Sequence, residues 1–274
     1  MRNFIKRIYG IGLLFWTKVI PYSIRIRTDP ELFGIIKFME YASGKVKSSD
    51  KVLDAGAGSC PYKKYFSHAQ YESTDFEDIF DKSSKNKHNF ICSLDKIPRP
   101  NNSYNIIINT QVLEHVEYPQ KVINEFYRIL KPGGKLFLTA PQGWGIHGKP
   151  YHFFNFTQYG LESLFKNAGF KIVFIKPRGG IFWYLGKRIK ILPSYIFFQY
   201  LFKKNTNAAG HRFFLVFILL PFYLFFLPIC SFFIPFLFFY LDKLDCQQDY
   251  TLGYACYCTK KGKRPYRLTQ PLVD

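Results

Sequence analysis

The sequence predicts a doubly wound α/β fold, in which helices cover both faces of a mostly parallel β-sheet. A short apolar strand ends in Asp54, and Gly56 and Gly58 follow it in a tight turn, where a ligand can lie against the backbone. Further strand-like and helix-like segments alternate up to residue 176. Residues 104–109 contain three consecutive isoleucines, which is typical of a buried parallel strand.

The chain has 274 residues, enough for one large domain or two small ones. Its 38 Lys and Arg residues outnumber its 19 Asp and Glu residues, which gives a net charge of +19. This charge indicates an anionic partner (nucleic acid, an acidic substrate or an anionic membrane surface) unless it only reflects a biased composition. The six cysteines show no paired C-x-x-C spacing, so we expect free thiols rather than disulfides or a zinc site.

Residues 1–49 are predicted to form an amino-terminal helical arm. Apolar residues at helical spacing between Phe4 and Phe15 predict an amphipathic helix that is too short to span a membrane. It can lie on a membrane or on the domain itself, and the sequence leaves both open. A second helix is predicted over residues 31–42, with Ser43 and Gly44 at its end.

After the glycine loop, residues 62–67 are expected to begin the first crossover helix. The next strand, near residues 71–74, ends at Asp75, which lies 21 positions after Asp54. A carboxylate at this place binds the ribose hydroxyls in nucleoside-cofactor folds, and Phe76 beside it can pack against an adenine. Asp75 is preferred to Glu77 and Asp78 because it comes first after the strand; a solvated acidic turn is the alternative.

A third strand is expected over residues 89–92, and one of Ser93 and Asp95 after it is expected to face the adenine edge. The fourth strand ends in Asn109 and Gln111, at the carboxyl edge of the sheet where ligands gather. Later segments predict a helix from Pro119, a strand over 135–141, a helix over 159–168 and a strand over 171–176.

Three segments together resemble the class I methyltransferases that use S-adenosylmethionine (SAM), with the sequences Asp54-Ala55-Gly56-Ala57-Gly58, Gln111-Val112-Leu113-Glu114-His115 and Leu130-Lys131-Pro132-Gly133-Gly134. They are most similar to the small-molecule group that contains the ubiquinone-type O-methyltransferases. The resemblance implies SAM as cofactor and a seven-stranded sheet whose last strand, near residues 250–259, lies antiparallel between the fifth and sixth. Ser93 and Asn105 depart from the family, which commonly has acids there. The residues expected to bind SAM are Asp54, Gly56, Gly58, Asp75, Phe76, Ser93, Asp95, Asn109 and Gln111.

Methyl transfer from a sulfonium is an in-line displacement, and a general base assists when the acceptor is a hydroxyl. His147 is the preferred base or acceptor contact, because it lies in a Gly-rich aromatic loop suited to cover an acceptor. His152 and His115 are alternatives, although His115 can also be a hydrogen-bonded residue at a helix start. Glu114 and His115 suggest a metal, but the metal-binding relatives carry another acid where Gln111 stands, so none is expected.

Residues 181–248 are predicted to be a hydrophobic, membrane-associating insertion in a methyltransferase domain formed by residues 50–180 and 249–260. Residues 213–241 carry no charge over 29 positions, more than the ~20 that a spanning helix needs. The prolines at 221, 228 and 235 predict kinks. Because the last strand must rejoin the sheet, we expect a re-entrant or interfacial element at the cytoplasmic face of a membrane; a buried helix pair or a dimer interface is the alternative. Its basic flanks are Lys187, Arg188, Lys190, Lys203, Lys204 and Arg212.

The sequence therefore predicts a SAM-dependent methyltransferase that O-methylates a small or lipid-linked acceptor at a membrane surface. An RNA methyltransferase is an alternative suggested by the net charge of +19, but the basic residues gather around the insertion and no separate RNA-binding module is evident. A non-catalytic, membrane-attached protein that keeps the fold is the other alternative, suggested by Ser93 and Asn105.

Overall fold

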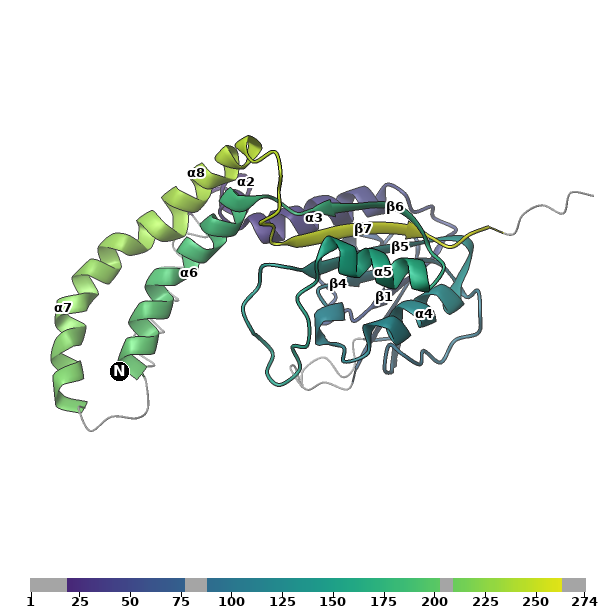
Figure 1. The fold of residues 1–274 in the computed structure, drawn as a ribbon, viewed down its shortest axis with the longest axis horizontal. Helices are drawn as coiled ribbons and strands as arrows, with labels where there is room; N and C mark the ends of the chain where they lie inside the picture. Colours follow the sequence, from purple (N-terminus) through teal and green to yellow (C-terminus); the bar gives the residue numbers. More distant parts are fainter. Residues whose placement is uncertain (1–18, 77–87, 203–208, 263–274) are drawn as a thin grey trace, which may run out of the picture. The chain divides into compact units, whose positions relative to one another are not determined.

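The computed structural model describes residues 19–76, 88–202 and 209–262. It divides into two compact units (Figure 1). One contains the described parts of Met1–Lys37 and Pro177–Leu252, and the other those of Phe38–Lys176 and Gly253–Asp274. The predicted first amphipathic helix, the acids Glu77 and Asp78, and the basic pair Lys203 and Lys204 lie outside the described residues.

The second unit is built on a seven-stranded sheet with the strand order β3-β2-β1-β4-β5-β7-β6. The pairings β1–β2, β1–β4, β2–β3 and β4–β5 are parallel, and β7 runs antiparallel to β5. The predicted fold class, with its antiparallel last strand between the fifth and sixth, is confirmed. The strands are β1 (Lys51–Ala55), β2 (Gln70–Asp75), β3 (Phe90–Ile91), β4 (Tyr104–Thr110), β5 (Leu130–Pro141), β6 (Lys171–Pro177) and β7 (Gly253–Thr259).

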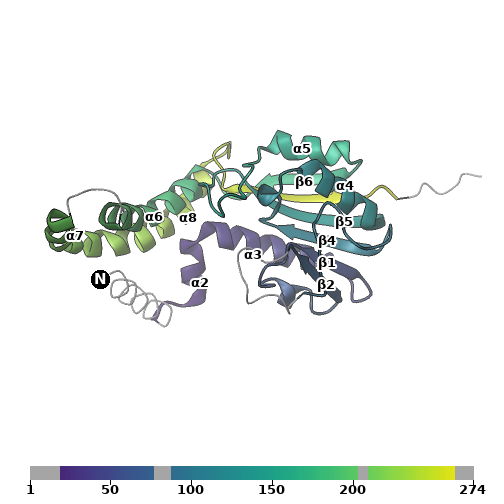
Figure 2. The ribbon, with the colours of Figure 1, turned by 90° about the horizontal axis from the view of Figure 1, so that it is seen from below.

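Alternate residues of the central strands build the core on both faces of the sheet. On one face, Leu136 and Leu138 belong to a buried cluster with residues of α4 (Pro119–Ile129) and α5 (Gln158–Asn167), which Figure 2 shows on the same side of the strands. On the other face, Phe137 stacks on Tyr257 and meets Phe38, from the carboxyl-terminal part of α3 (Pro30–Ser43). Burial on both faces explains why the isoleucines of β4 form an uninterrupted run.

The prediction that the first crossover helix begins at residues 62–67 is wrong. Residues 62–67 contain only the 3-10 turn η2 (Lys63–Tyr65). Phe66 is the one fully buried side chain in this stretch, because the neighbouring residues are lysines, tyrosines and a serine. Without further apolar residues at helical spacing, the segment has no face to bury against the sheet.

Residues 131–134, which come before the predicted strand over 135–141, lie inside β5 as a bulge. Tyr104 pairs with Leu130 and Ile106 with Lys135, so residues 131–134 are inserted opposite Asn105. The Asn105 Oδ1 atom accepts hydrogen bonds from the Lys51 amide at 3.1 Å and from the Lys131 Nζ atom at 2.9 Å. Asn105 therefore joins the first residues of β1, β4 and β5, at a position where the related family commonly has an acid.

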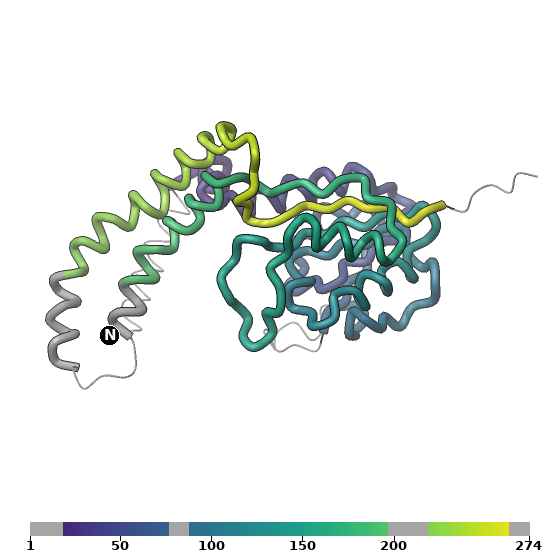
Figure 3. Tube along the Cα trace, viewed as in Figure 1, coloured from purple at the N-terminus to yellow at the C-terminus, as the bar shows by residue number. Residues whose placement is uncertain are grey.

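The first unit is a helical hairpin with a short helical base. Its arms are α6 (Ile181–Phe202) and the chain formed by α7 (Ala209–Pro228), the π-helical turn η4 (Ile229–Phe233) and α8 (Ile234–Leu241). Figure 3 follows the described part of α6 beside α8, and the two pack together. Pro193 and Pro221 lie inside helices, whereas α7 ends at Pro228 and the π-helical turn follows directly.

Two carboxylates close the hairpin where its arms meet. Asp242, in the turn η5 (Asp242–Leu244), accepts hydrogen bonds of 2.9 Å from the amides of Gly180 and Trp183. Asp245 accepts one of 2.7 Å from the Ile181 amide. These bonds satisfy amides at the start of α6 that have no partner within the helix.

The base of this unit contributes acids that pair with basic residues of α6. Before α3 the base contains α2 (Tyr22–Arg25) and the 3-10 turn η1 (Ile26–Thr28). Lys187 lies 2.7 Å from Asp29 and 3.2 Å from Glu31. The predicted basic flank of the insertion is therefore partly neutralised within its own unit.

Candidate active site

The glycine loop after β1 has a conformation that requires glycine at two positions. Gly56 and Gly58 have φ angles of +79° and +51°. A Cβ atom on Gly56 would lie 2.6 Å from both methyl groups of Val112, whereas one on Gly58 would meet nothing within 4 Å. Packing against Val112 thus requires glycine at position 56, whereas the open space beside Gly58 leaves its backbone accessible to a ligand.

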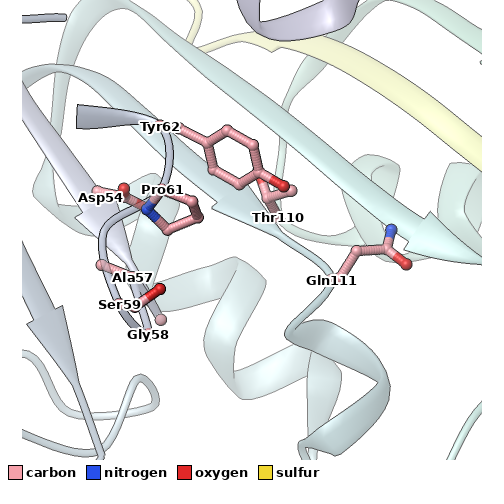
Figure 4. Close-up of a pocket in the computed structure, with 9 residues that line it drawn as sticks. Asp54, Ala57, Gly58, Ser59, Pro61, Tyr62, Thr110 and Gln111 are labelled. Atoms are coloured by element: carbon pink, nitrogen blue, oxygen red, sulfur yellow. The ribbon is translucent and has the colours of Figure 1, made fainter. Parts of the chain in front are cut away.

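A cavity of about 220 Å³ lies between this loop and the end of β4. Figure 4 shows the loop residues facing Thr110 and Gln111. Four residues that the sequence singled out line it together: Asp54, Gly56, Gly58 and Gln111. Five lining residues were missed: Ala57, Ser59 and Thr110, which adjoin predicted residues, and Pro61 and Tyr62, which follow a few positions after Gly58.

Asp54 is buried at the wall of the cavity, with 1% of its surface exposed. The Tyr71 hydroxyl donates a 2.7 Å hydrogen bond to its Oδ2 atom. Burial raises the pKa of Asp54 to about 6; the Tyr71 bond opposes this effect, and the nearby charge of Asp75 adds to it. The carboxyl group therefore changes its charge near neutral pH, and a cationic ligand beside it favours the ionised form.

Asp75 ties the glycine loop to the end of β2. Its Oδ2 atom accepts a 2.6 Å hydrogen bond from the Gly58 amide, and its Oδ1 atom accepts one of 2.7 Å from the Phe76 amide. The Phe76 side chain is 56% exposed. Neither residue lines the cavity, so their predicted contacts with ribose and adenine stay predictions.

Ser93, Asp95 and Asn109 also lie outside the cavity lining. The Ser93 hydroxyl donates a hydrogen bond to Asp95. Asn109 is fully buried and donates a 2.8 Å hydrogen bond to the Ala55 carbonyl, which joins β4 to β1. Its Oδ1 atom has no hydrogen-bond partner within the described part of the chain. Asn109 thus joins the carboxyl ends of β1 and β4, which contribute residues to the cavity lining.

Gln111 connects the cavity to β5. It has a φ angle of +56°, which is unusual for a residue other than glycine and is typical of functional sites. Its amide bonds to the Thr139 carbonyl at 3.0 Å, and its side chain donates to the Thr139 hydroxyl at 3.1 Å. These bonds fix the backbone where the cavity meets the following turn, η3 (Leu113–His115).

The structure brings the three predicted histidines together. The His147 ring lies 4.8 Å from the His115 ring and 4.4 Å from the His152 ring, measured between centroids. His115 bonds through Nδ1 to the Tyr151 carbonyl at 2.5 Å, and His147 through Nδ1 to the Gly145 carbonyl at 3.1 Å. A carbonyl only accepts, so both Nδ1 atoms carry a proton, and in a neutral ring each Nε2 atom has a lone pair.

The loop after β5 is held over η3 by its backbone. The amides of Phe153 and Phe154 donate to the Glu114 carbonyl, and the Phe156 amide donates to the Pro141 carbonyl. Burial lowers the pKa of His115, and the nearby His147 and His152 rings act in the same direction. A neutral imidazole in this cluster can accept a proton from an acceptor hydroxyl.

A family model described as a methyltransferase domain matches residues 30–174, a stretch that contains the glycine loop, the cavity and the histidine cluster. The chain belongs to this methyltransferase family. The resemblance predicted from the sequence, to class I methyltransferases of the small-molecule type that use SAM, is thereby confirmed.

Relatives of this methyltransferase agree with that assignment. It is 28% identical over 115 residues to the mitochondrial ubiquinone biosynthesis O-methyltransferase of Mus musculus, covering 35% of this chain and 30% of that protein. It is 31% identical over 152 residues to a thiol S-methyltransferase of Homo sapiens, covering 51% of this chain and 59% of that protein. The chain thus spans about a third to three fifths of the length of these curated relatives.

A crystal structure of a SAM-dependent methyltransferase from Archaeoglobus fulgidus shares the fold, with a TM-score of 0.51 at 15% identity, covering 84% of this chain and 94% of that one. SAM, the expected cofactor, is the cofactor of the family. The residues present fit it, since the open backbone at Gly58 and the buried carboxyl of Asp54 meet at one cavity. The cavity is smaller than the ~300 Å³ of a whole ligand pocket, so its walls enclose only part of such a cofactor.

Proposed function

We propose that this methyltransferase transfers a methyl group from SAM to a hydroxyl group of a small or lipid-linked acceptor at a membrane surface. The observation that carries the proposal is the cavity between the glycine loop and Gln111, inside the segment that the family model matches. When bound, SAM supplies a methyl group on a cationic sulfur. Asp54 and the backbone at Gly58 hold its charged end, and Asp75 and Phe76 hold its nucleoside.

His147 is the proposed base. Its Nδ1 atom is engaged with the Gly145 carbonyl, which leaves Nε2 to take the proton of an acceptor hydroxyl. His152 uses its Nδ1 atom to accept a 3.3 Å hydrogen bond from the His147 amide, so it positions the loop that carries His147. An acceptor oxygen that has given its proton to His147 would be the nucleophile for the methyl group that SAM would supply in line, with the sulfur as the leaving group.

One relative is named for O-methylation in ubiquinone biosynthesis, and another for S-methylation of thiols. Oxygen and sulfur are therefore the two acceptor atoms to test. We favour oxygen because the motifs resemble the ubiquinone-type group most. Purified protein would be supplied with SAM carrying a labelled methyl group and, separately, a phenol, an alkyl thiol, extracted membrane lipids and total RNA. We expect label in the phenol or lipid fraction; label only in the thiol or only in RNA would contradict the proposal.

Membrane association is proposed for the hydrophobic insertion 181–248, beside a methyltransferase domain of residues 50–180 and 249–260. Within the described residues, one helical stretch, Leu219–Leu244, is long and apolar enough to cross a membrane, and little of it is buried. Phe222, Phe225 and Phe233 are each at least 60% exposed. Several large exposed aromatic side chains on one apolar stretch favour contact with lipid rather than water.

The hairpin is proposed to lie at one interface instead of crossing twice. The uncharged part of α6, residues 191–202, spans only about 18 Å, and a hydrocarbon core is about 30 Å thick. Basic residues lie near both ends of this stretch, which suits a helix pair along an anionic surface. Since the chain returns from the hairpin to β7, the domain and both ends of the hairpin stay on the cytoplasmic side.

A vesicle-flotation assay tests this part of the proposal. We expect the full chain to float with vesicles that contain anionic lipid, and the triple variant F222S/F225S/F233S to stay below. The matched control changes three exposed apolar side chains of the methyltransferase unit, I91S/Y118S/Y159S, and should float like the wild type. Equal flotation of both variants, or no flotation of the wild type, would contradict membrane association.

A further inference from the structure

We propose that Arg25, Arg27 and Arg188, at the base of the helical hairpin, form an arginine surface that binds the phosphate groups of anionic phospholipids in a bilayer. The inference rests on the proposed membrane association and names the kind of lipid that the hairpin meets. Each guanidinium carbon lies within 6 Å of the centre of an aromatic ring of the same unit. Arginine suits this role because its planar fork of N–H groups matches the oxygens of a phosphate.

The lysines of the predicted basic flank are engaged within the unit. Lys187 lies 2.7 Å from Asp29 and 3.2 Å from Glu31. The Lys190 Nζ atom donates a 2.9 Å hydrogen bond to the Thr28 carbonyl and lies 3.9 Å from the Asp29 carboxylate. These lysines therefore hold α6 to the segment before α3, and the arginines of the same region become the candidates for contact with anionic lipid.

The arginine surface lies where the uncharged parts of both hairpin arms begin. Arg188 comes less than one turn before residues 191–202, the uncharged part of α6. Arg27 lies over Phe239, less than one turn before the uncharged part of the other arm ends. Trp183 stacks on Phe239 with 5.2 Å between ring centroids, which ties the two places together. When the apolar parts of the hairpin enter the acyl boundary, the arginines are thus at the depth of the phosphates.

Arg27 is the best-defined member of the arginine surface. One of its guanidinium nitrogens, Nη1, donates a hydrogen bond to the Ser23 carbonyl, and its guanidinium carbon lies 5.9 Å from the centroid of the Phe239 ring. Among the residues that the structure describes, no acid forms an ion pair with it. A phosphate anion is a suitable counterion for such a cation, because charge-assisted hydrogen bonds are the stronger ones.

The aromatic rings around the arginines suit the headgroup layer of a membrane. Tyr22, under Arg25, and Tyr240, beside Phe239, are both exposed. The Trp183 ring N–H donates a 3.1 Å hydrogen bond to the Phe239 carbonyl. Tyr and Trp are enriched at membrane–water interfaces because they join an apolar ring to a polar group. This composition therefore favours an interface over bulk water.

Nucleic acid is the other anionic partner that a net charge of +19 suggests. The hairpin surface beyond the arginines is apolar, and Leu192, Tyr195 and Leu237 are exposed there. An RNA strand on the arginines would leave these side chains in water, whereas a bilayer covers them with its acyl chains and meets the arginines with its phosphates. The observations therefore favour an anionic bilayer.

The test compares binding of the full-length protein to vesicles of neutral phosphatidylcholine and to vesicles that also contain phosphatidylglycerol. The wild type should bind the anionic vesicles at least tenfold more tightly, with a preference that weakens as salt increases. R25Q/R27Q/R188Q should bind the anionic vesicles about 10- to 100-fold more weakly than the wild type. It should bind the neutral vesicles as the wild type does, because the apolar surface is unchanged.

Two further variants serve as controls. K47Q/K96Q/K121Q removes the same number of charges from exposed lysines of the methyltransferase unit and should bind anionic vesicles within about threefold of the wild type. R25K/R27K/R188K restores the charge and should bind them more tightly than the glutamine variant. Melting temperatures and SAM binding of all samples separate a loss of folding from a loss of lipid contact.

Four results would overturn the arginine surface: equal binding of the wild type to both kinds of vesicle, unchanged anionic binding in R25Q/R27Q/R188Q, an equal loss in K47Q/K96Q/K121Q, or no recovery in R25K/R27K/R188K. Loss of binding to total RNA in the glutamine variant, with unchanged vesicle binding, would assign the arginines to nucleic acid instead. Equal binding to both vesicles overturns the arginine surface alone, whereas a wild type that binds neither vesicle also contradicts the proposed membrane association.

Discussion

The backbone amide of Gly58 donates a 2.6 Å hydrogen bond to the carboxylate of Asp75, which joins the loop after β1 to the end of β2. The shape of the glycine loop and the position of the proposed ribose contact are therefore set together. A ligand that hydrogen-bonds to Asp75 therefore also affects the conformation of the glycine loop, which lines the cavity.

We predict that Asp75→Ala lowers SAM affinity by about 10- to 100-fold, because it removes the ribose contact and frees the Gly58 amide. Asp75→Asn keeps an oxygen that can accept from this amide and should lose less. The free energy of unfolding should fall by only about 1 kcal/mol in Asp75→Ala, since Asp75 lies at an exposed bond. Calorimetry and thermal melting measure the two effects; SAM affinity equal to that of the wild type would exclude Asp75 from the cofactor site.

The two loop glycines should differ when each is replaced by alanine. Gly56→Ala places a Cβ atom 2.6 Å from Val112 in a left-handed conformation and should lower the free energy of unfolding by about 2 to 5 kcal/mol. Gly58→Ala meets open space and should cost about 1 to 2 kcal/mol, while lowering SAM affinity at least tenfold. Chemical denaturation checks the order, and a more stable Gly56→Ala than Gly58→Ala would contradict the loop geometry.

Asp54 should make stability depend on pH. Burial raises its folded pKa from 3.8 to about 6, so between pH 4 and 6 the unfolded chain ionises while the folded protein stays protonated. The free energy of unfolding should therefore fall by about 3 kcal/mol as pH rises through this window, and change no further above it. Denaturation of the wild type and Asp54→Asn at several pH values isolates the effect; a constant difference between them would contradict the raised pKa.

SAM binding should change with pH in the opposite sense. SAM carries an ammonium and a sulfonium, and the ionised form of Asp54 attracts these charges. Affinity should rise by up to tenfold per pH unit up to about pH 6, and then level off. Titration calorimetry at several pH values measures this slope. Asp54→Asn should bind SAM weakly, with an affinity that does not change with pH in this range. A wild-type affinity that is independent of pH would show that Asp54 does not contact the cofactor.

Asp242 should matter for the hairpin and not for the cofactor site. Asp242→Ala leaves the amides of Gly180 and Trp183 without their carboxylate and should destabilise the helical unit by about 1 to 3 kcal/mol. Hydrogen exchange should increase in α6 and α8, while SAM affinity stays within a factor of about two, because the cavity belongs to the other unit. Equal loss of protection around β1 would contradict this separation.

Most of the sheet could be predicted from sequence because β1, β4, β5 and β6 contain short apolar runs, whereas β2 is largely polar. The segment before β2 was mispredicted as a helix. Only its place between two strands suggested a crossover helix, because Phe66 is the one buried side chain there and no apolar residues recur at helical spacing. The partnership of Tyr71 with Asp54 was also missed. It depends on the parallel register of β1 and β2, which a single sequence does not display.

The candidate site could be predicted where its residues are consecutive in the chain. The glycine loop and the end of β4 supply the whole cavity lining, and both were recognised as motifs. The histidine cluster could be named only as separate candidates. Its rings meet because the amides of Phe153 and Phe154 bond to the Glu114 carbonyl, and no residue pattern marks such backbone contacts.

Calorimetric titration of SAM into the detergent-solubilised full chain tests the central claim most directly, with Gly58→Ala and Asp75→Ala measured beside the wild type. The account predicts binding of one equivalent in the micromolar range by the wild type, and at least tenfold weaker binding by both variants. A folded wild type that binds no SAM, or variants that bind it as tightly as the wild type, would contradict a cofactor site at the glycine loop.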